Sequence, residues 1–211
     1  MVFLLSLLGA GISVVGFLSY NKKIISGIVK PNMATWILFS FLSVLNLTSY
    51  LVMTQDIVKS LLPLVSTMAT LSVLTIAVVK GQFSKLNTWD TLALIIGGVS
   101  GLVWLVFKSA GLANLILQFS VIISFIPTYW GIIRGNNIEK ISPWMTWTTT
   151  YIIMIFVVAI RNGQWIEYIY PVVAGVLHSG VGIVVCFSKI FCRVQLDRDK
   201  IFLFLPKRGN V

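Results

Sequence analysis

The side chains in this sequence that could bind or react with a solute are few, and most of them lie inside long apolar runs. His178 is the single histidine of the chain and lies about eleven residues into the last of these runs. Burial at that depth disfavours a charged imidazolium, so we expect a neutral ring that donates from one nitrogen and accepts at the other. Such a ring could bind a hydroxyl or amide of a solute, or take up a proton where water reaches it. The alternative is a histidine that only bonds a neighbouring helix.

Other candidate binding residues lie in earlier apolar runs. Asn46 and Thr70 lie near the middle of their runs, whereas Trp36 and Trp147 lie nearer one end. Polar side chains in hydrocarbon face the interior of a helix bundle, so the sequence predicts one central site for a small polar solute. The predicted site consists of Trp36, Asn46, Thr70, Trp147 and His178. The alternatives are interfacial anchoring for the tryptophans, packing between helices for Asn46, and a bond to its own backbone for Thr70.

No motif for catalysis or metal binding accompanies these residues. The chain has no HExxH motif, no phosphate-binding loop and no acidic pair inside an apolar run. Cys186 and Cys192 are the two cysteines, and their spacing is not that of a CxxC motif. We therefore expect no enzyme activity, no cofactor and no metal site.

The composition is that of a membrane protein. Of the 211 residues, 57% are hydrophobic and 10% are charged, whereas a soluble domain carries roughly a quarter charged residues. The net charge of +10 comes from Lys and Arg between the apolar runs and in the tail. We interpret these residues as orienting the chain in a bilayer, and we expect no nucleic-acid partner. Whether the chain forms a homo-oligomer is left open.

The lengths of the apolar runs predict an all-α integral membrane fold. A membrane-spanning helix needs about 20 mostly apolar residues, and seven runs meet that requirement. The predicted helices cover residues 2–19, 33–53, 60–79, 90–107, 111–133, 144–161 and 167–188.

The distribution of basic residues predicts the orientation. If the N-terminus lies outside, thirteen Lys and Arg residues lie inside, and Lys59, Lys108 and Arg161 are the three outside. Because basic residues concentrate on the cytoplasmic side of membrane proteins, we predict an outer N-terminus and a cytoplasmic C-terminus. The expected location is the bacterial inner membrane.

Landmark residues occur twice in the chain and in the same order. The matched pairs are Phe17 and Phe125, Pro31 and Pro143, Trp36 and Trp147, and Pro63 and Pro171. They predict a three-helix repeat over residues 1–82, a linker helix over 88–108, a second repeat over 110–190 and a cytoplasmic tail over 191–211. Because the linker adds one crossing between two three-helix units, both repeats have the same orientation in the membrane.

Five prolines in or beside the apolar runs are candidate hinges. They are Pro31, Pro63, Pro127, Pro143 and Pro171. For Pro31 and Pro143 the alternative is a proline that begins a helix in its first turn.

This 3+1+3 arrangement resembles the SWEET and PQ-loop superfamily of seven-helix membrane transporters. The resemblance covers about residues 1–190, and it rests on Pro127, on Arg134 in the following loop and on the paired segments KPNMATW and ISPWMTW. It is closest to uncharacterised bacterial members of this length. The chain lacks the PQ dipeptide, because Thr128 follows Pro127. It also has Val172 where the sugar facilitators carry an asparagine after the proline of the last helix.

The resemblance implies a facilitator that moves a small polar solute by alternating access through a pocket between the repeats. Because the pattern of the sugar carriers is incomplete, it does not imply a sugar. The superfamily also contains the KDEL receptors. A receptor or accessory membrane protein that transports nothing is therefore the alternative.

Overall fold

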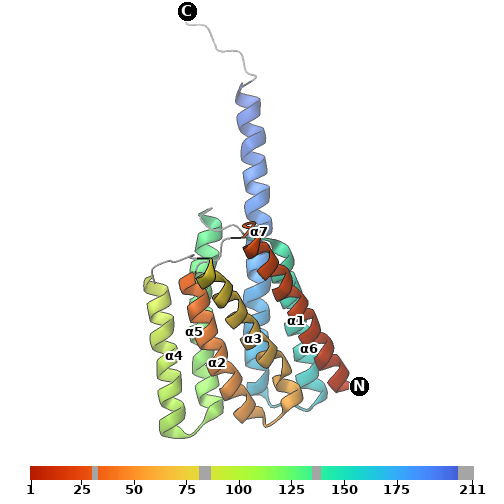
Figure 1. The fold of residues 1–211 in the computed structure, drawn as a ribbon, viewed down its shortest axis with the longest axis vertical. Coiled ribbons are helices and arrows are strands. Elements are labelled where there is room, and N and C mark those ends of the chain that lie inside the picture. The colour runs from red at the N-terminus through yellow and green to blue at the C-terminus, as the bar shows by residue number, and fades with distance from the viewer. Residues whose placement is uncertain (30–32, 81–86, 135–138, 204–211) are drawn as a thin grey trace, which may run out of the picture.

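The computed structural model describes residues 1–29, 33–80, 87–134 and 139–203 of the chain, and the side chains of residues 33–35 and 189–203 lie outside the description. This part of the chain forms seven α-helices and no strand (Figure 1). They are α1 (Val2–Ile25), α2 (Met33–Thr54), α3 (Ile57–Val79), α4 (Thr88–Phe107), α5 (Ala110–Ile133), α6 (Ile141–Ile160) and α7 (Trp165–Leu203). Each contains a segment long and apolar enough to cross a membrane, so the predicted number and type of the elements are confirmed.

Polar caps in short loops set the starts of several helices. Asp56 begins α3 by accepting from the backbone N–H groups of Val58 and Lys59. Asn87 and Asp90 form a capping box at the start of α4. Such caps satisfy N–H groups that have no partner inside the helix. Both helices therefore begin a few residues before the apolar runs from which they were predicted.

Two helices extend well beyond their predicted ends. α1 continues to Ile25 because Tyr20, Asn21 and Ile24 form a further buried turn of its inner face. α7 continues to Leu203, so residues 191–203 of the predicted tail prolong the last helix. The sequence between Cys192 and Leu203 contains neither glycine nor proline and is rich in good helix formers, which accounts for the extension.

The helices pack in two groups of three. In the first group α3 packs against α1 and α2, and in the second α7 packs against α5 and α6. The groups meet where α1 packs against α6 and where α2 packs against α5, while α4 lies at the periphery against α5 and α2. The odd-numbered helices run in one direction, so the start of α1 and the end of α7 lie at opposite ends of the bundle (Figure 1).

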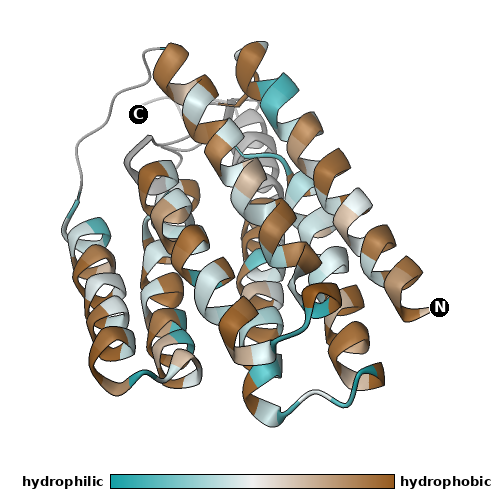
Figure 2. Ribbon diagram, turned by 60° about the horizontal axis from the view of Figure 1, so that its bottom comes forward, coloured by the Kyte–Doolittle hydropathy of each residue, from teal (hydrophilic) through white to brown (hydrophobic). Residues whose placement is uncertain are grey.

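Hydrophobic residues predominate along the helices (Figure 2), and many large apolar side chains are exposed on the outside of the bundle. On α4, Leu102, Leu105 and Phe107 are 60%, 66% and 67% exposed. A surface of this kind suits contact with lipid and not with water. Seven apolar helices with such a surface are consistent with an integral membrane protein.

The two ends of the bundle carry different charges. The basic end is where α1, α3 and α5 finish and α6 begins, and it bears Lys22, Lys23, Lys80, Arg134 and Lys140. At the opposite end α3 and α7 begin, and two ion pairs form there from Asp56, Lys59, Arg161 and Glu167. We call this second end the ion-pair end.

Candidate functional site

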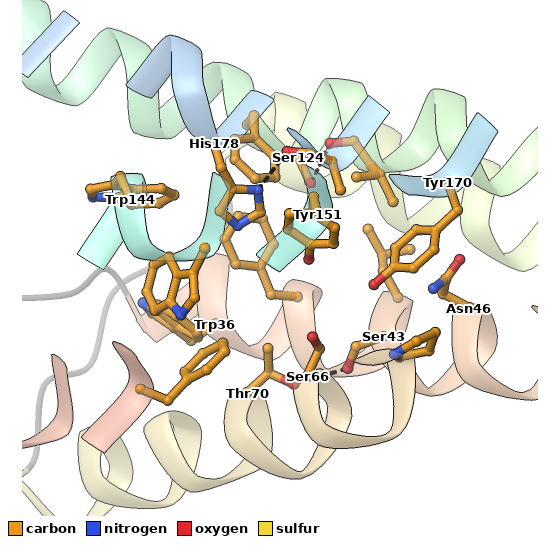
Figure 3. A pocket seen from close by; sticks show the side chains of 18 residues that line it. Trp36, Ser43, Asn46, Ser66, Thr70, Ser124, Trp144, Tyr151, Tyr170 and His178 are labelled. Atoms are coloured by element: carbon orange, nitrogen blue, oxygen red, sulfur yellow. Dashed lines mark hydrogen bonds between the residues drawn. The ribbon is translucent and has the colours of Figure 1, made fainter. Parts of the chain in front are cut away.

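A cavity of about 90 Å³ lies between the two groups of helices (Figure 3). This volume holds several water molecules or a small solute. Its described lining comes from every helix except α4, and it includes no Lys, Arg, Asp or Glu. The lining residues are Phe17, Trp36, Phe39, Leu42, Ser43, Asn46, Pro63, Ser66, Thr70, Val121, Ser124, Phe125, Trp144, Trp147, Tyr151, Tyr170, Ala174 and His178.

All five residues of the predicted solute site line this cavity. Trp36 and Asn46 reach it from α2, Thr70 from α3, Trp147 from α6 and His178 from α7. Helical periodicity and the repeat therefore indicated side chains that share one space. That any of them binds a solute stays a prediction.

Four of the five predicted hinge prolines lie in the described residues, and they occupy two kinds of position. Pro63, Pro127 and Pro171 lie inside α3, α5 and α7, where a proline removes a backbone hydrogen bond and favours a bend. Pro143 lies in the first turn of α6, where the missing N–H has no helical partner to lose. That position matches the alternative, a proline that begins a helix. Pro31 lies outside the described residues.

His178 presents an acceptor nitrogen to the cavity. Its Nδ1 lies 2.7 Å from the backbone oxygen of Ala174, one turn earlier in α7. Because that oxygen only accepts, a neutral His178 carries its proton on Nδ1, and Nε2 is the acceptor. Figure 3 shows the ring projecting from α7 among the other lining side chains. Among the described residues the histidine bonds its own helix and not a neighbouring one, so Nε2 is available to a partner in the cavity.

Aromatic rings fix the position of the His178 ring. Its centroid lies 5.1 Å from that of Phe125, 5.5 Å from Trp144, 5.7 Å from Trp147 and 5.0 Å from Tyr151. These are the separations at which aromatic pairs attract one another. The imidazole is thus held in one orientation by rings from α5 and α6.

Asn46 presents the opposite chemistry, a donor. Its side-chain oxygen accepts from Asn114 Nδ2 at 3.1 Å and from Gln118 Nε2 at 3.3 Å. Asn114 also donates to Ser49 Oγ at 2.9 Å, so α2 and α5 share a buried polar cluster. Because two amide donors fix the oxygen of Asn46, its own NH₂ group is left for the cavity. Asn46 therefore both packs between helices and lines the cavity.

Thr70 and Ser43 join α3 to α2 beside the cavity. The hydroxyl of Thr70 bonds the carbonyl of Thr67 at 3.0 Å and lies 2.9 Å from Ser43 Oγ. Thr67 in turn donates to the carbonyls of Pro63 at 2.9 Å and Ser43 at 3.0 Å. The bond from Thr70 to its own backbone, which was the alternative for this residue, is present, and its hydroxyl still borders the cavity.

Six of the seven tryptophans divide into two sets by exposure, and Trp104 of α4 is partly exposed. Trp36, Trp144 and Trp147 are at most 5% exposed and form walls of the cavity. Trp89, Trp130 and Trp165 lie at helix ends and are 47–71% exposed, which is the arrangement of interfacial anchors. The predicted site residues Trp36 and Trp147 thus belong to the cavity set.

Ionic contacts hold the cavity's boundary at the ion-pair end. Lys59 lies one turn before Pro63 in α3, and its Nζ is 2.5 Å from Glu167 Oε2, one turn before Pro171 in α7. Pro171 has no N–H to bond the carbonyl of Glu167, and that carbonyl instead accepts from Tyr50 Oη at 2.9 Å. α2, α3 and α7 are thus joined just beyond the cavity.

A second ion pair at this end joins Asp56 to Arg161. Burial alone would raise the pKa of Asp56. The Arg161 guanidinium and the backbone N–H groups of Val58 and Lys59 outweigh that effect and hold the pKa below its usual value. The loop before α3 is therefore tied to the end of α6 by a carboxylate that stays ionised at neutral pH.

The boundary at the basic end is aromatic, with one carboxylate. Glu139, just before α6, accepts from Tyr20 Oη at 3.1 Å and from Trp144 Nε1 at 3.2 Å. Burial raises the pKa of Glu139 to about 7, although those two hydrogen bonds and the charge of Lys23 act in the opposite direction. α1 and the start of α6 are thus joined through this carboxyl.

Sequence reasoning missed several members of the site. Tyr151 lies one turn after Trp147 and Trp144 one turn before it, so the face of α6 already indicated by Trp147 could have predicted both. Tyr170 directly precedes Pro171, but no periodic signal marks it. Glu139 lies in a loop by sequence, and nothing in its neighbours predicts contact with α1.

Neither the metal-ligating residue types nor the comparisons with known proteins assign a function to this cavity. Among the described residues, no group of three or more His, Cys, Asp or Glu side chains is placed to hold a metal ion. Comparisons with protein-family models, with curated proteins and with solved structures find no match to this chain. The resemblance to the SWEET and PQ-loop superfamily therefore stays a prediction that rests on the residues quoted for it.

Proposed function

We propose that the protein is a SWEET-like facilitator that moves a small polar solute across the membrane by alternating access. The observation that carries this proposal is the cavity between α1–α3 and α5–α7, which has different closing contacts at its two ends. Opening one end while the other stays closed would expose the same cavity to each side in turn. Motion of one group of helices against the other, with Pro63, Pro127 and Pro171 as bending points, would supply the change.

Matched residues on both sides of the cavity support the proposed 3+1+3 repeat. Two landmark pairs contribute both members to the lining, Phe17 with Phe125 and Trp36 with Trp147. Counting from the matched prolines Pro63 and Pro171, Ser66 corresponds to Ala174 and Thr70 to His178, and all four of these residues also line the cavity. The packing of helices also has matching pairs, since α1 against α6 corresponds to α5 against α2. Both features are expected of parallel repeats about an axis along the membrane normal.

The charges at the two ends support an outer N-terminus in a bacterial inner membrane. At the ion-pair end Lys59 and Arg161 are paired with Glu167 and Asp56, which leaves Lys108 as the remaining basic residue of that end. The basic end carries the larger positive charge and suits the cytoplasmic side. A reporter enzyme that is active only outside the membrane, fused after Val211, should be silent, and an active reporter would reject this orientation.

The lining of the cavity favours a neutral solute over a charged one. Asn46 supplies a donor, His178 an acceptor and the aromatic rings an apolar surface, whereas the described lining includes no Lys, Arg, Asp or Glu. A receptor for a charged peptide would need charges there, because an unpaired charge is costly to bury. Transport of a neutral solute fits this lining better than the receptor alternative.

The test is uptake by purified protein in lipid vesicles, screened with labelled small polar solutes. The blocking variant Thr70→Trp fills the cavity, and Leu71→Trp is its matched control because Leu71 is 40% exposed on the outer side of the same helix. We expect at least one solute to enter faster than into protein-free vesicles. We expect Thr70→Trp to reduce that uptake at least about ten-fold, a loss of roughly 1.4 kcal/mol in barrier terms, and Leu71→Trp to retain it. Equal effects of both variants, or no uptake of any solute, would reject the proposal.

A further inference from the structure

Glu139 joins two helices that belong to different halves of the molecule. One carboxyl oxygen accepts from the hydroxyl of Tyr20 in α1 at 3.1 Å, and the other accepts from the indole N–H of Trp144 in α6 at 3.2 Å. Tyr20 and Trp144 are 0% and 2% exposed. The helices α1 and α6 cannot separate at the basic end without breaking at least one of these bonds.

The same two rings form the cover of the cavity at the basic end. Trp144 lines the cavity directly. The ring of Tyr20 lies 5.4 Å from that of Trp36 and 5.5 Å from that of Trp147, and both of these also line the cavity. Movement of Tyr20 away from Trp144 would therefore uncover the cavity on this side.

The surroundings of Glu139 make its charge sensitive to pH. The nearby basic group of α1, Lys23, donates to Ser142 Oγ at 2.9 Å, and the ion pairs of the described residues are those at the opposite end. Lys140 follows Glu139 in the chain, while Tyr20 and Trp144 are uncharged donors. Glu139 is partly buried, and partial burial without an ion-pair partner among the described residues favours the protonated carboxyl.

We propose that Glu139 is a proton-binding site that closes the basic end of the cavity when it is protonated and lets that end open when it is ionised. A neutral carboxyl can keep both contacts, since its O–H can donate to the oxygen of Tyr20 while its carbonyl accepts from Trp144. An ionised carboxylate gains more by moving into water, and water is reached by separating α1 from α6. The proton comes from the solvent on closing and returns to it on opening.

The direction of the pH effect follows from linkage. Burial raises the pKa of Glu139 from 4.5 to about 7 in the closed arrangement, and a solvated carboxyl keeps the ordinary value. The closed form therefore binds the proton more tightly, so it is favoured at low pH and loses that advantage as the pH rises through about 7. The ratio of closed to open protein should fall by at most about 3 × 10²-fold between pH 4.5 and about 7.

The experiment measures the opening of the basic end without any solute. Cys186 and Cys192 are replaced by serine, and spin labels are attached to cysteines introduced at exposed Ser26 beside α1 and Ile141 in the first turn of α6. Distances between the labels are measured by electron spin resonance in lipid nanodiscs from pH 5 to pH 9. We expect the short distance to dominate at pH 5, and a longer distance to grow in as the pH rises to about 7 and to stay constant above it.

Three variants decide the outcome. Glu139→Gln should stay at the short distance at every pH, because its neutral amide keeps an acceptor for Trp144 and never ionises. Asp90→Asn is the matched control: Asp90 is a buried carboxylate at the same end that bonds the backbone N–H of Asn87, so the variant should keep the pH response. Tyr20→Phe keeps the ring and loses one bond, so it should be more open at each pH while still responding to pH.

The proposal is overturned if the native distances do not change with pH, if the longer distance grows as the pH falls, or if Glu139→Gln responds as the native protein does. If Glu139→Gln fails to fold, the native protein and Tyr20→Phe still decide between these outcomes. Because the measurement contains no solute, a failure to find transport would leave its result unchanged. Conversely, uptake without pH-dependent opening would reject this proposal and keep the proposed function.

Discussion

The two ends of the cavity are closed by contacts of different physical kinds. At the ion-pair end, two ion pairs join opposite groups of helices, Lys59 with Glu167 and Asp56 with Arg161. At the basic end, one carboxyl accepts from two aromatic donors, Lys23 donates to Ser142, and the rings around Tyr20 pack against one another. One end is thus held by opposite charges, and the other by hydrogen bonds to one carboxyl and by close packing of rings.

This difference predicts that the two ends respond to different conditions. The pKa of Asp56 is held below its usual value by Arg161 and backbone donors despite the opposing effect of burial, so this contact does not change near neutral pH. Burial raises the pKa of Glu139 to about 7, so we expect the contacts of the basic end to change near neutral pH. The ion-pair end should be sensitive to loss of a charge, and the basic end to pH and to small changes in volume.

The largest effect is expected from breaking the buried ion pair. Lys59→Met leaves the Glu167 carboxylate buried without its partner, since both side chains are under 10% exposed. The expected cost is about 3–5 kcal/mol of unfolding free energy. Thermal unfolding of the purified protein in detergent measures this loss of stability, with the remaining fraction of monodisperse protein as the readout.

The control for this prediction exchanges the two charges. In Lys59→Glu combined with Glu167→Lys the pair can re-form, so the double variant should regain much of the stability that Lys59→Met loses. A Lys59→Met protein as stable as the native one would show that the pair is not buried as described. The ion-pair end would then not be held by charge.

A smaller effect is expected from adding one methyl group near the basic end. A Cβ at Gly16 would lie 2.9 Å from Trp147 Nε1 and 3.1 Å from Thr146 Cγ2, so Gly16→Ala must displace α6 or the Trp147 ring. The expected loss is about 1–3 kcal/mol of unfolding free energy. Gly11→Ala on the same helix is the matched control, because its Cβ would meet nothing within 4 Å. Equal stability of the two variants would contradict close packing between α1 and Trp147.

The helices could be predicted from the sequence because a membrane imposes a minimum apolar length. Their boundaries were less predictable, since they depend on caps such as Asp56 and Asn87 and, for α7, on helix propensity beyond the apolar run. Part of the candidate site could also be predicted from the sequence. Helical periodicity gives the residues that share a face, and the repeat indicates which faces correspond.

Periodicity does not reveal which faces meet across the bundle. Lys59 and Glu167 are 108 residues apart, and by sequence each is an ordinary charge near a loop. Glu139 and Tyr20 are 119 residues apart and become partners because α1 packs against α6. The contacts that close the cavity are therefore properties of the packing, whereas several residues that line it were visible in local sequence.

The ion-pair end also contains a neutral contact that should have a moderate effect. Tyr50→Phe removes the hydroxyl that bonds the Glu167 carbonyl, which Pro171 leaves without a helical donor. An unsatisfied buried carbonyl costs about 1–3 kcal/mol, and the loss of unfolding free energy should fall in the lower half of that range. Tyr168→Phe is the control, because Tyr168 lies on the same turn of α7 and is only partly buried. Thermal unfolding in detergent compares the stability of the two variants. A larger loss of unfolding free energy for Tyr168→Phe than for Tyr50→Phe would contradict the hydrogen bond assigned between Tyr50 and the Glu167 carbonyl.

The smallest effect is expected from the exposed ion pair, and it tests the contrast in pH response. Arg161 is 38% exposed in its pair with Asp56, so Asp56→Asn should cost only about 0–1 kcal/mol. The pKa of Asp56 is lowered below 3.8 in the folded protein, so its contribution is present above that pH and is lost only as the pH falls below it. Between pH 5 and pH 9 the stability difference between native protein and Asp56→Asn should therefore stay constant.

The same measurement on Glu139→Gln should differ, because a raised pKa gives a contribution that is full below 4.5 and is lost as the pH rises through about 7. Thermal unfolding of the three proteins at several pH values gives both differences, and a difference for Asp56→Asn that varies near pH 7 would remove the distinction between the ends.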